Sequence, residues 1–259
     1  MIYEACVGSI EEAILAKKKG ANRIELCDNL EEGGTTPSYG TIKICKEVLD
    51  IPIACMIRPR GGDFNYTKEE IKAMIEDIKI CKDLKVEAVV FGVLKKDKSL
   101  DIENMKLLCE SAKPLKIVFH KAIDEMSNPL EIIDTLYELG VNRILTSGTK
   151  NTAFEGKDIL NELIQACKDK MKIVVAGKVT KDNVENLSKL INSDEFHGKK
   201  IVWLIEKAYF RKLFFYHSYL ISKEVFIFAS WKPNFLSLSI VNVIGVSALA
   251  VIFNLFIRV

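Results

Sequence analysis

Two cysteines could together hold a soft metal ion. Cys6 and Cys27 each follow a glutamate by two positions, Glu4 and Glu25, and each ends a short run typical of a strand. Side chains two apart in a strand face the same side, so each thiol shares a face with a carboxylate. Neighbouring strands lie about 4.8 Å apart, which would bring the two thiolates to a distance that suits an ion such as Cu(I). The alternative is that both are ordinary core residues, since free cysteine is among the most buried residue types.

Two arginines lie just after a third apolar run and could bind an anion. Arg58 and Arg60 precede a Gly-Gly turn, and each guanidinium offers paired donors to a carboxylate or a phosphate. The same arginines could instead pair with Glu25, Asp63 or Glu4 and only balance their charge. The residues leave both interpretations open.

His120 and Asp124 have the residue types of a general base and the carboxylate that orients it. His197 ends the last apolar run and is a second candidate base. A histidine at a strand end is also often only a hydrogen-bonded structural residue. In an enzyme acting on a small anion, such as a sugar acid or a phosphate, Glu25 or His120 would be the general base and Arg58 and Arg60 would bind the anion.

Three segments with a glycine follow the later apolar runs and could hold a phosphate. They are 146–148, which contains Ser147, and 176–178 and 197–200, which contain lysines. Phosphate sites in α/β barrels are usually formed by the loops after the seventh and eighth strands. These motifs are short, and they identify no particular ligand.

The elements that must position these residues alternate between strand and helix. Strands are expected at 2–6, 23–27, 51–57, 88–91, 116–120, 143–146, 172–175 and 195–197. Helices are expected at 9–19, 38–49, 68–84, 102–112, 129–139, 157–169 and 181–191. Eight such units predict an α/β protein with a parallel sheet closed into a (β/α)8 TIM barrel. Closure also provides a lumen for the charged side chains of the strands, which an open sheet covered on both faces would not.

Composition excludes several classes of protein. A net charge of +2 over 259 residues gives no general case for nucleic acid binding. Seven cysteines, an odd number with no CxxC pair, argue against a disulfide framework or a structural zinc site and favour reduced thiols in the cytoplasm. The first residues lack the basic start and apolar run of a signal peptide.

The last part of the chain breaks the repeating pattern. We expect a barrel domain at 1–202 and a divergent apolar tail at 203–259. Residues 235–257 carry no charge and have the length of a membrane span, so the protein would be a barrel tethered to a membrane. A reading-frame shift would produce a similar composition, and an ordinary packed extension is the third interpretation.

Several blocks of sequence are similar to the CutC copper homeostasis family, in that family's order, over about residues 1–202. They are RIELCDNLEEGGTTPS at 23–38, MIRPRGGDFNYT at 56–67, VFG at 90–92, FHKAID at 119–124, RILTSG at 143–148 and EFHG at 195–198. The resemblance implies a (β/α)8 barrel in the cytoplasm, associated with copper tolerance and copper binding, without an established reaction. One departure is residues 175–179, VAGKV, where the family usually has a proline and three glycines. A lysine side chain there would crowd a backbone anion site.

The resemblance also implies roles for individual residues. It implies Cu(I) ligation by Cys6 and Cys27. It implies a polar pocket formed by Glu4, Arg23, Glu25, Arg58, Arg60, His120, Asp124 and His197. The expected partner is therefore a copper ion or, in the enzyme alternative, a small anionic ligand that lyase, isomerase or hydrolase chemistry would convert. A homo-oligomer is compatible with both.

Overall fold

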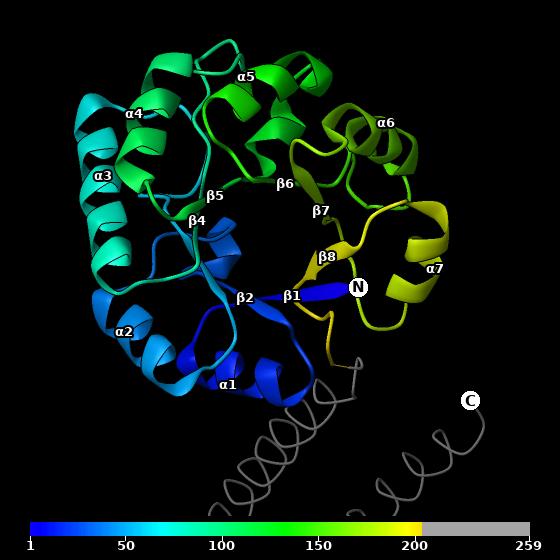
Figure 1. Ribbon diagram of the computed structural model, residues 1–259, viewed down its shortest axis with the longest axis horizontal. Helices are drawn as coiled ribbons and strands as arrows, with labels where there is room; N and C mark the ends of the chain where they lie inside the picture. The colour runs from blue at the N-terminus through cyan, green and yellow to red at the C-terminus, as the bar shows by residue number, and fades with distance from the viewer. Residues whose placement is uncertain (204–259) are drawn as a thin grey trace, which may run out of the picture. The chain divides into compact units, whose positions relative to one another are not determined.

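The strands form a closed parallel barrel in sequence order, β1 to β8, in which β1 also pairs with β8 (Figure 1). The computed structural model describes residues 1–203. Its strands are β1 (Ile2–Val7), β2 (Arg23–Leu26), β3 (Ile53–Met56), β4 (Ala88–Phe91), β5 (Lys116–Phe119), β6 (Arg143–Thr146), β7 (Lys172–Val175) and β8 (Glu195–Gly198). The predicted TIM barrel is confirmed.

The helices ring the outside of the barrel. They are α1 (Ile10–Lys18), α2 (Tyr39–Val48), α3 (Lys68–Asp83), α4 (Ile102–Ala112), α5 (Ile133–Glu138), α6 (Lys157–Cys167) and α7 (Val184–Leu190). Short 3-10 turns stand at Leu30–Glu32, Lys121–Glu125 and Pro129–Ile132. The helix expected at 129–139 is therefore a 3-10 turn followed by a short α-helix.

Local signals set the helix ends. Thr67 and Glu70 form a complete capping box at the start of α3, in which each side chain accepts from the other residue's backbone N–H. At α1, Ser9 accepts from the backbone of Glu12, whereas the Glu12 carboxylate accepts from the backbone N–H of Gly8, so only half of that box forms. Gly140 ends the α5 unit with φ +86°, a conformation that glycine adopts without strain.

Alternate strand residues separate the core into two layers. One set packs between the strands and the surrounding helices in a large apolar core. The other set fills the barrel interior and is formed by small or medium side chains, Cys6, Cys27, Ala54, Met56, Ala88, Val90, Val118, Leu145, Val174 and Ala176. The interior is thus a packed layer and not a pore, as in other barrels of this size.

The predicted tail, apart from Trp203, lies outside the described residues. The division at 202 and the candidate span at 235–257 stay predictions, together with the alternative of a frame-shifted end. Between residues 1 and 203, no helix is long and apolar enough to cross a membrane.

Candidate functional site

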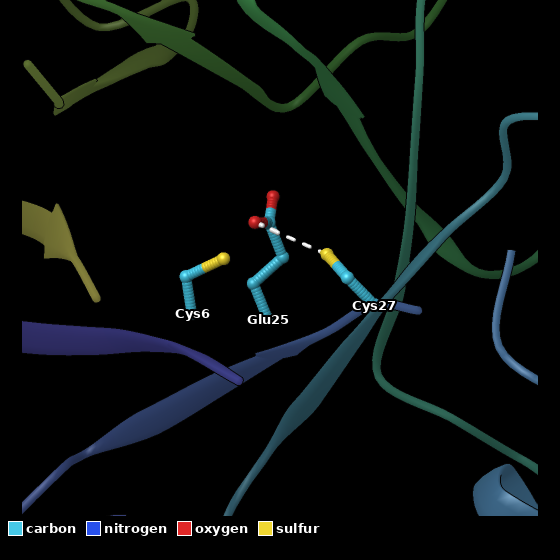
Figure 2. Close-up of side chains that lie close together, drawn as sticks. All are labelled: Cys6, Glu25 and Cys27. Atoms are coloured by element: carbon cyan, nitrogen blue, oxygen red, sulfur yellow. Dashed lines mark hydrogen bonds between the residues drawn. The ribbon is translucent and has the colours of Figure 1, made fainter. Parts of the chain in front are cut away.

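Cys6, Glu25 and Cys27 converge inside the barrel, where β1 and β2 lie side by side (Figure 2). The register pairs Cys6 with Glu25, and Cys27 follows the last residue of β2. One ligand atom from each of the three side chains lies within 4.8 Å of the other two. Cys27 Sγ donates to Glu25 Oε2 over 3.6 Å. The exposed fractions are 7% for Cys6 and 1% for Cys27, so the thiols are almost entirely shielded from solvent.

A column of buried charged side chains continues from this cluster along the lumen. His197 Nε2 lies 3.6 Å from Glu25 Oε2, and His197 Nδ1 lies 2.9 Å from Glu4 Oε1. Arg23 donates from Nε to Glu4 and from Nη2 to Glu195 Oε2, the latter over 2.5 Å. These contacts join three strands, β1, β2 and β8, because β8 closes the barrel against β1. The column provides a continuous polar path from the thiols to the amino-terminal end of the strands.

The pKa values of the two thiols are shifted in opposite directions. The adjacent Cys27 thiol lowers the pKa of Cys6 well below its usual value; burial opposes this shift, and His197 reinforces it. The adjacent Cys6 thiol, together with burial, raises the pKa of Cys27 well above the usual value. Cys6 is therefore the first of the two thiols to lose its proton.

The neighbouring acidic and basic groups are shifted as well. Burial would raise the pKa of Glu4, but the hydrogen bond to His197 and the charge of Arg23 lower it to about 2. Burial, with the negative charges of Cys6 and Glu4, raises the pKa of Glu25 well above its usual value. Burial would lower the pKa of His197, but the acidic groups that face it raise it well above 6.5. A protonated His197 beside an ionised Glu4 follows from these shifts.

Comparison with known proteins identifies the fold family. The sequence model of the CutC family matches residues 1–202. The chain belongs to the CutC family. A CutC family protein of Parabacteroides distasonis is 42% identical over 197 residues, which cover 76% of this chain and 81% of the relative. The human copper homeostasis protein cutC homolog is 40% identical over 196 residues, which cover 76% of this chain and 72% of the relative.

A solved structure of a CutC copper homeostasis protein from Streptococcus agalactiae superimposes with a TM-score of 0.75 at 35% identity. The match covers 78% of this chain and 99% of that one. Other barrels, including an aldolase at 11% identity and a TM-score of 0.57, share the fold alone. The family resemblance that the sequence blocks predict is confirmed.

His120 follows β5 at the mouth of this CutC barrel. Among the described residues, no hydrogen bond connects it to Cys6 or Cys27. Its Nδ1 accepts from the backbone N–H of Ala122 at 3.3 Å, and the Phe64 ring packs against it with centroids 4.7 Å apart. Its Nε2 is buried and has no partner within the described part of the chain. Burial and the charge of Arg58 lower its pKa to about 3. The ring is therefore neutral and presents an unpaired Nε2–H.

The structure does not join His120 to Asp124 as a base and its orienting carboxylate. No hydrogen bond links the two side chains among residues 1–203. Asp124 instead accepts from Thr146 Oγ1 at 2.5 Å, from both the backbone and the hydroxyl of Ser147 at 3.1 and 3.0 Å, and from the backbone of Thr149 at 2.9 Å. Lys121 pairs with the same carboxylate. Asp124 therefore holds the loop after β6 against the loop after β5, and Ser147 is one of the residues that donate to it.

The two arginines of the predicted anion clamp are bonded to the protein itself. Arg58 donates to the backbone carbonyls of Glu32, Gly34 and Gly62 at 2.6–3.1 Å, so it ties the loops after β2 and β3 together. Arg60 pairs with Glu70 at 2.6 Å and Asp63 at 3.0 Å. Charge pairing, the alternative interpretation of the sequence, matches the contacts of Arg60.

One buried charged side chain of the lumen, that of Arg143, is not among the residues predicted from the sequence. Arg143 opens β6 with an exposed fraction of 7%, and its Nε and Nη2 have no partner within the described part of the chain. Burial and the charge of Arg23 lower its pKa. Alternate residues of a strand share a face, and Arg143 lies two residues before the inward-facing Leu145. This spacing could have predicted that Arg143 faces the lumen.

Proposed function

We propose that this CutC family protein takes part in copper homeostasis by binding Cu(I) between the sulfurs of Cys6 and Cys27. The observation that carries the proposal is the convergence of two free, buried thiols inside the barrel, with ligand atoms within 4.8 Å. Soft thiolate ligands select Cu(I). The thiolate is the form that binds a metal, and the lowered pKa of Cys6 means that one of the two is readily available.

The charges around the thiols suit the same ligand. Two thiolates and one Cu(I) ion together carry a net charge of −1, which is costly in the buried barrel interior unless a cation faces it. His197, whose pKa is raised, lies next to the cluster and can supply that positive charge. The human relative is named a copper homeostasis protein homolog, which agrees with this assignment.

A cytoplasmic location fits the cysteine chemistry. All seven cysteines are free and buried, with none in a disulfide. Thiols stay reduced in the cytosol, where Cu(I) has to be held by protein or small thiols. The proposed role is holding or passing on Cu(I), because the cluster offers two thiol ligands and a cation that faces them.

Competition for Cu(I) with a chromophoric chelator tests the assignment on the full chain. Cys6→Ser and Cys27→Ser should each weaken binding, and the double variant should abolish it. Cys109→Ser is the matched control, because Cys109 is equally buried but packs between the strands and the helices, where its pKa is raised to about 12. Unchanged affinity in the double variant would remove the proposal.

The second candidate is an enzyme acting on a small anion, and the unpaired Nε2–H of His120 is the observation that favours it. A buried donor without an acceptor is costly, and a ligand oxygen at the barrel mouth would satisfy it. A thermal-shift screen of small carboxylates and phosphates tests this, since a ligand specific to the folded state raises the melting temperature. A genuine ligand should lose its effect in His120→Gln, whereas an equal shift in both proteins argues against the site.

A further inference from the structure

The interior of the barrel contains a third sulfur beside the two thiols. Among the ten residues of the interior cluster, Met56 is the one methionine, and the other members besides Cys6 and Cys27 are alanine, valine or leucine. Met56 ends β3 with an exposed fraction of 4%. The remaining methionines within the described residues belong to the outer core or to the chain start.

The register of the sheet places Met56 next to Cys27. Leu26 of β2 pairs with Cys55 of β3, so the residues that follow them, Cys27 and Met56, are neighbours across the two strands. Both side chains belong to the interior cluster. Neighbouring strands are about 4.8 Å apart, which is within reach of a side chain as long as methionine.

Gly34 shows that the two side chains border the same space. This glycine has φ +91°, and a Cβ placed on it would lie 3.3 Å from Cys27 Sγ and 3.7 Å from the terminal methyl carbon of Met56. A side chain at position 34 would therefore touch both residues. Methionine is unbranched and adapts its rotamer readily, so its thioether can be directed to the thiols without moving the backbone.

Met56 suits a buried Cu(I) better than the oxygen of Glu25 does. A thioether is a soft ligand, of the kind that selects Cu(I), whereas a carboxylate is a hard one. A thioether is also neutral, so it adds no negative charge to two thiolates in a place shielded from water. An ionised Glu25 would instead add a third negative charge beside the two thiolates.

We propose that the thioether sulfur of Met56 is the third ligand of the Cu(I) ion held by Cys6 and Cys27. The inference rests on the proposed copper function and makes it more specific, because it assigns a site of three sulfurs drawn from β1, β2 and β3. The loop that contains Gly34 borders the site, because a side chain there would touch both Cys27 and Met56.

X-ray absorption at the copper edge tests the assignment on the full chain. The protein is prepared with selenomethionine in place of methionine and loaded with one equivalent of Cu(I). We expect a copper–selenium scattering shell that disappears in Met56→Leu, a substitution that keeps the side-chain volume. Met105→Leu, in the outer core, is the control and should retain the shell. Cu(I) affinity should fall about tenfold or more in Met56→Leu, the scale that loss of even an outer partner of a metal ligand produces.

The outcomes separate the two proposals. A spectrum with two sulfurs and no selenium, in a protein whose Cys6→Ser/Cys27→Ser variant no longer binds copper, overturns the role of Met56 and leaves the thiol site. A selenium shell that persists in Met56→Leu overturns it as well. Undiminished copper binding by the double cysteine variant overturns both. If Met56→Leu fails to fold, the presence or absence of selenium scattering in the parent protein still decides the question.

Discussion

Replacing Glu4 with glutamine should destabilise the barrel, because the glutamate carboxylate accepts from two buried partners. Arg23 and His197 both contact it, and its exposed fraction is 2%. Glutamine keeps the size of the side chain but removes the negative charge. The Arg23 guanidinium would then remain buried with only Glu195 to balance it.

The magnitude follows from the pKa of Glu4. Folding lowers that pKa from 4.5 to about 2. Each pKa unit corresponds to about 1.4 kcal/mol, so ionised Glu4 favours the folded state by roughly 3 kcal/mol near neutral pH. Removing one partner of a buried ion pair costs about 3–5 kcal/mol in other proteins, which agrees. We therefore expect the free energy of unfolding of Glu4→Gln to be lower by about 3 kcal/mol.

The difference between the two proteins should depend on pH in a defined direction. A carboxylate with a lowered pKa stabilises the fold fully above its unfolded pKa, here 4.5, and loses that contribution as the pH falls toward 2. The difference should shrink from about 3 kcal/mol at pH 7 to about 2 kcal/mol at pH 3.5.

Urea unfolding followed by fluorescence or circular dichroism measures the difference. Glu110→Gln is the matched control, since Glu110 pairs with Lys113 on the surface and both side chains are 60% exposed. An exposed pair of this kind contributes little to stability. If Glu4→Gln were no more destabilising than the control, or if the difference grew on acidification, the description of a charge-paired lumen would be wrong.

Four further predictions concern other parts of the site. Cys6 should be the first thiol alkylated at neutral pH, because its pKa is lowered and its exposed fraction of 7% is the largest among the seven cysteines; peptide mass spectrometry would contradict this by finding another cysteine modified faster. The His120 ring should stay neutral from pH 8 to pH 5 in an NMR titration, since its pKa is about 3. The unfolded chain takes up this proton near pH 6.5, so His120 destabilises the fold only as the pH falls below about 6.5. A titration midpoint of the His120 signals near 6.5 in the folded protein would refute this. Arg58→Lys should cost about 3 kcal/mol in urea unfolding because three charge-assisted bonds to carbonyls are lost, whereas Arg60→Lys, at a side chain that is 39% exposed, should cost under about 1 kcal/mol. Gly92→Ala should cost about 1–3 kcal/mol and shift the His120 NMR signals, because the added Cβ would lie 2.8 Å from His120 Nδ1; unchanged signals would argue against this packing.

The sequence predicted the barrel because its signals are local. Alternating strand and helix patterns depend on neighbouring residues, and Thr67 with Glu70 marks a helix start within four positions. The boundaries were less accurate where tertiary packing decides them. The third strand was expected at 51–57 and occupies Ile53–Met56.

The sequence was less informative about the partners of individual side chains. His120 and Asp124 are four residues apart, yet the carboxylate of Asp124 accepts from the β6 loop, more than twenty residues further along. Arg58 donates to carbonyls of two different loops. Residue type and spacing cannot specify such bonds, because most of the available donors and acceptors come from other loops and are brought together only by the fold.

The thiol pair and the charges that surround it depend on different parts of the fold. Cys6 and Cys27 lie on adjacent strands at the start of the chain, so one β-α-β unit brings them together. His197 reaches them only because β8 closes the barrel by pairing with β1, which sets it opposite Glu4. An open barrel would therefore keep both thiols but lose the cation beside them, and its affinity for a copper–thiolate group of net negative charge should be lower. Copper should in turn favour the closed barrel, since a ligand that binds the closed form more tightly stabilises that form.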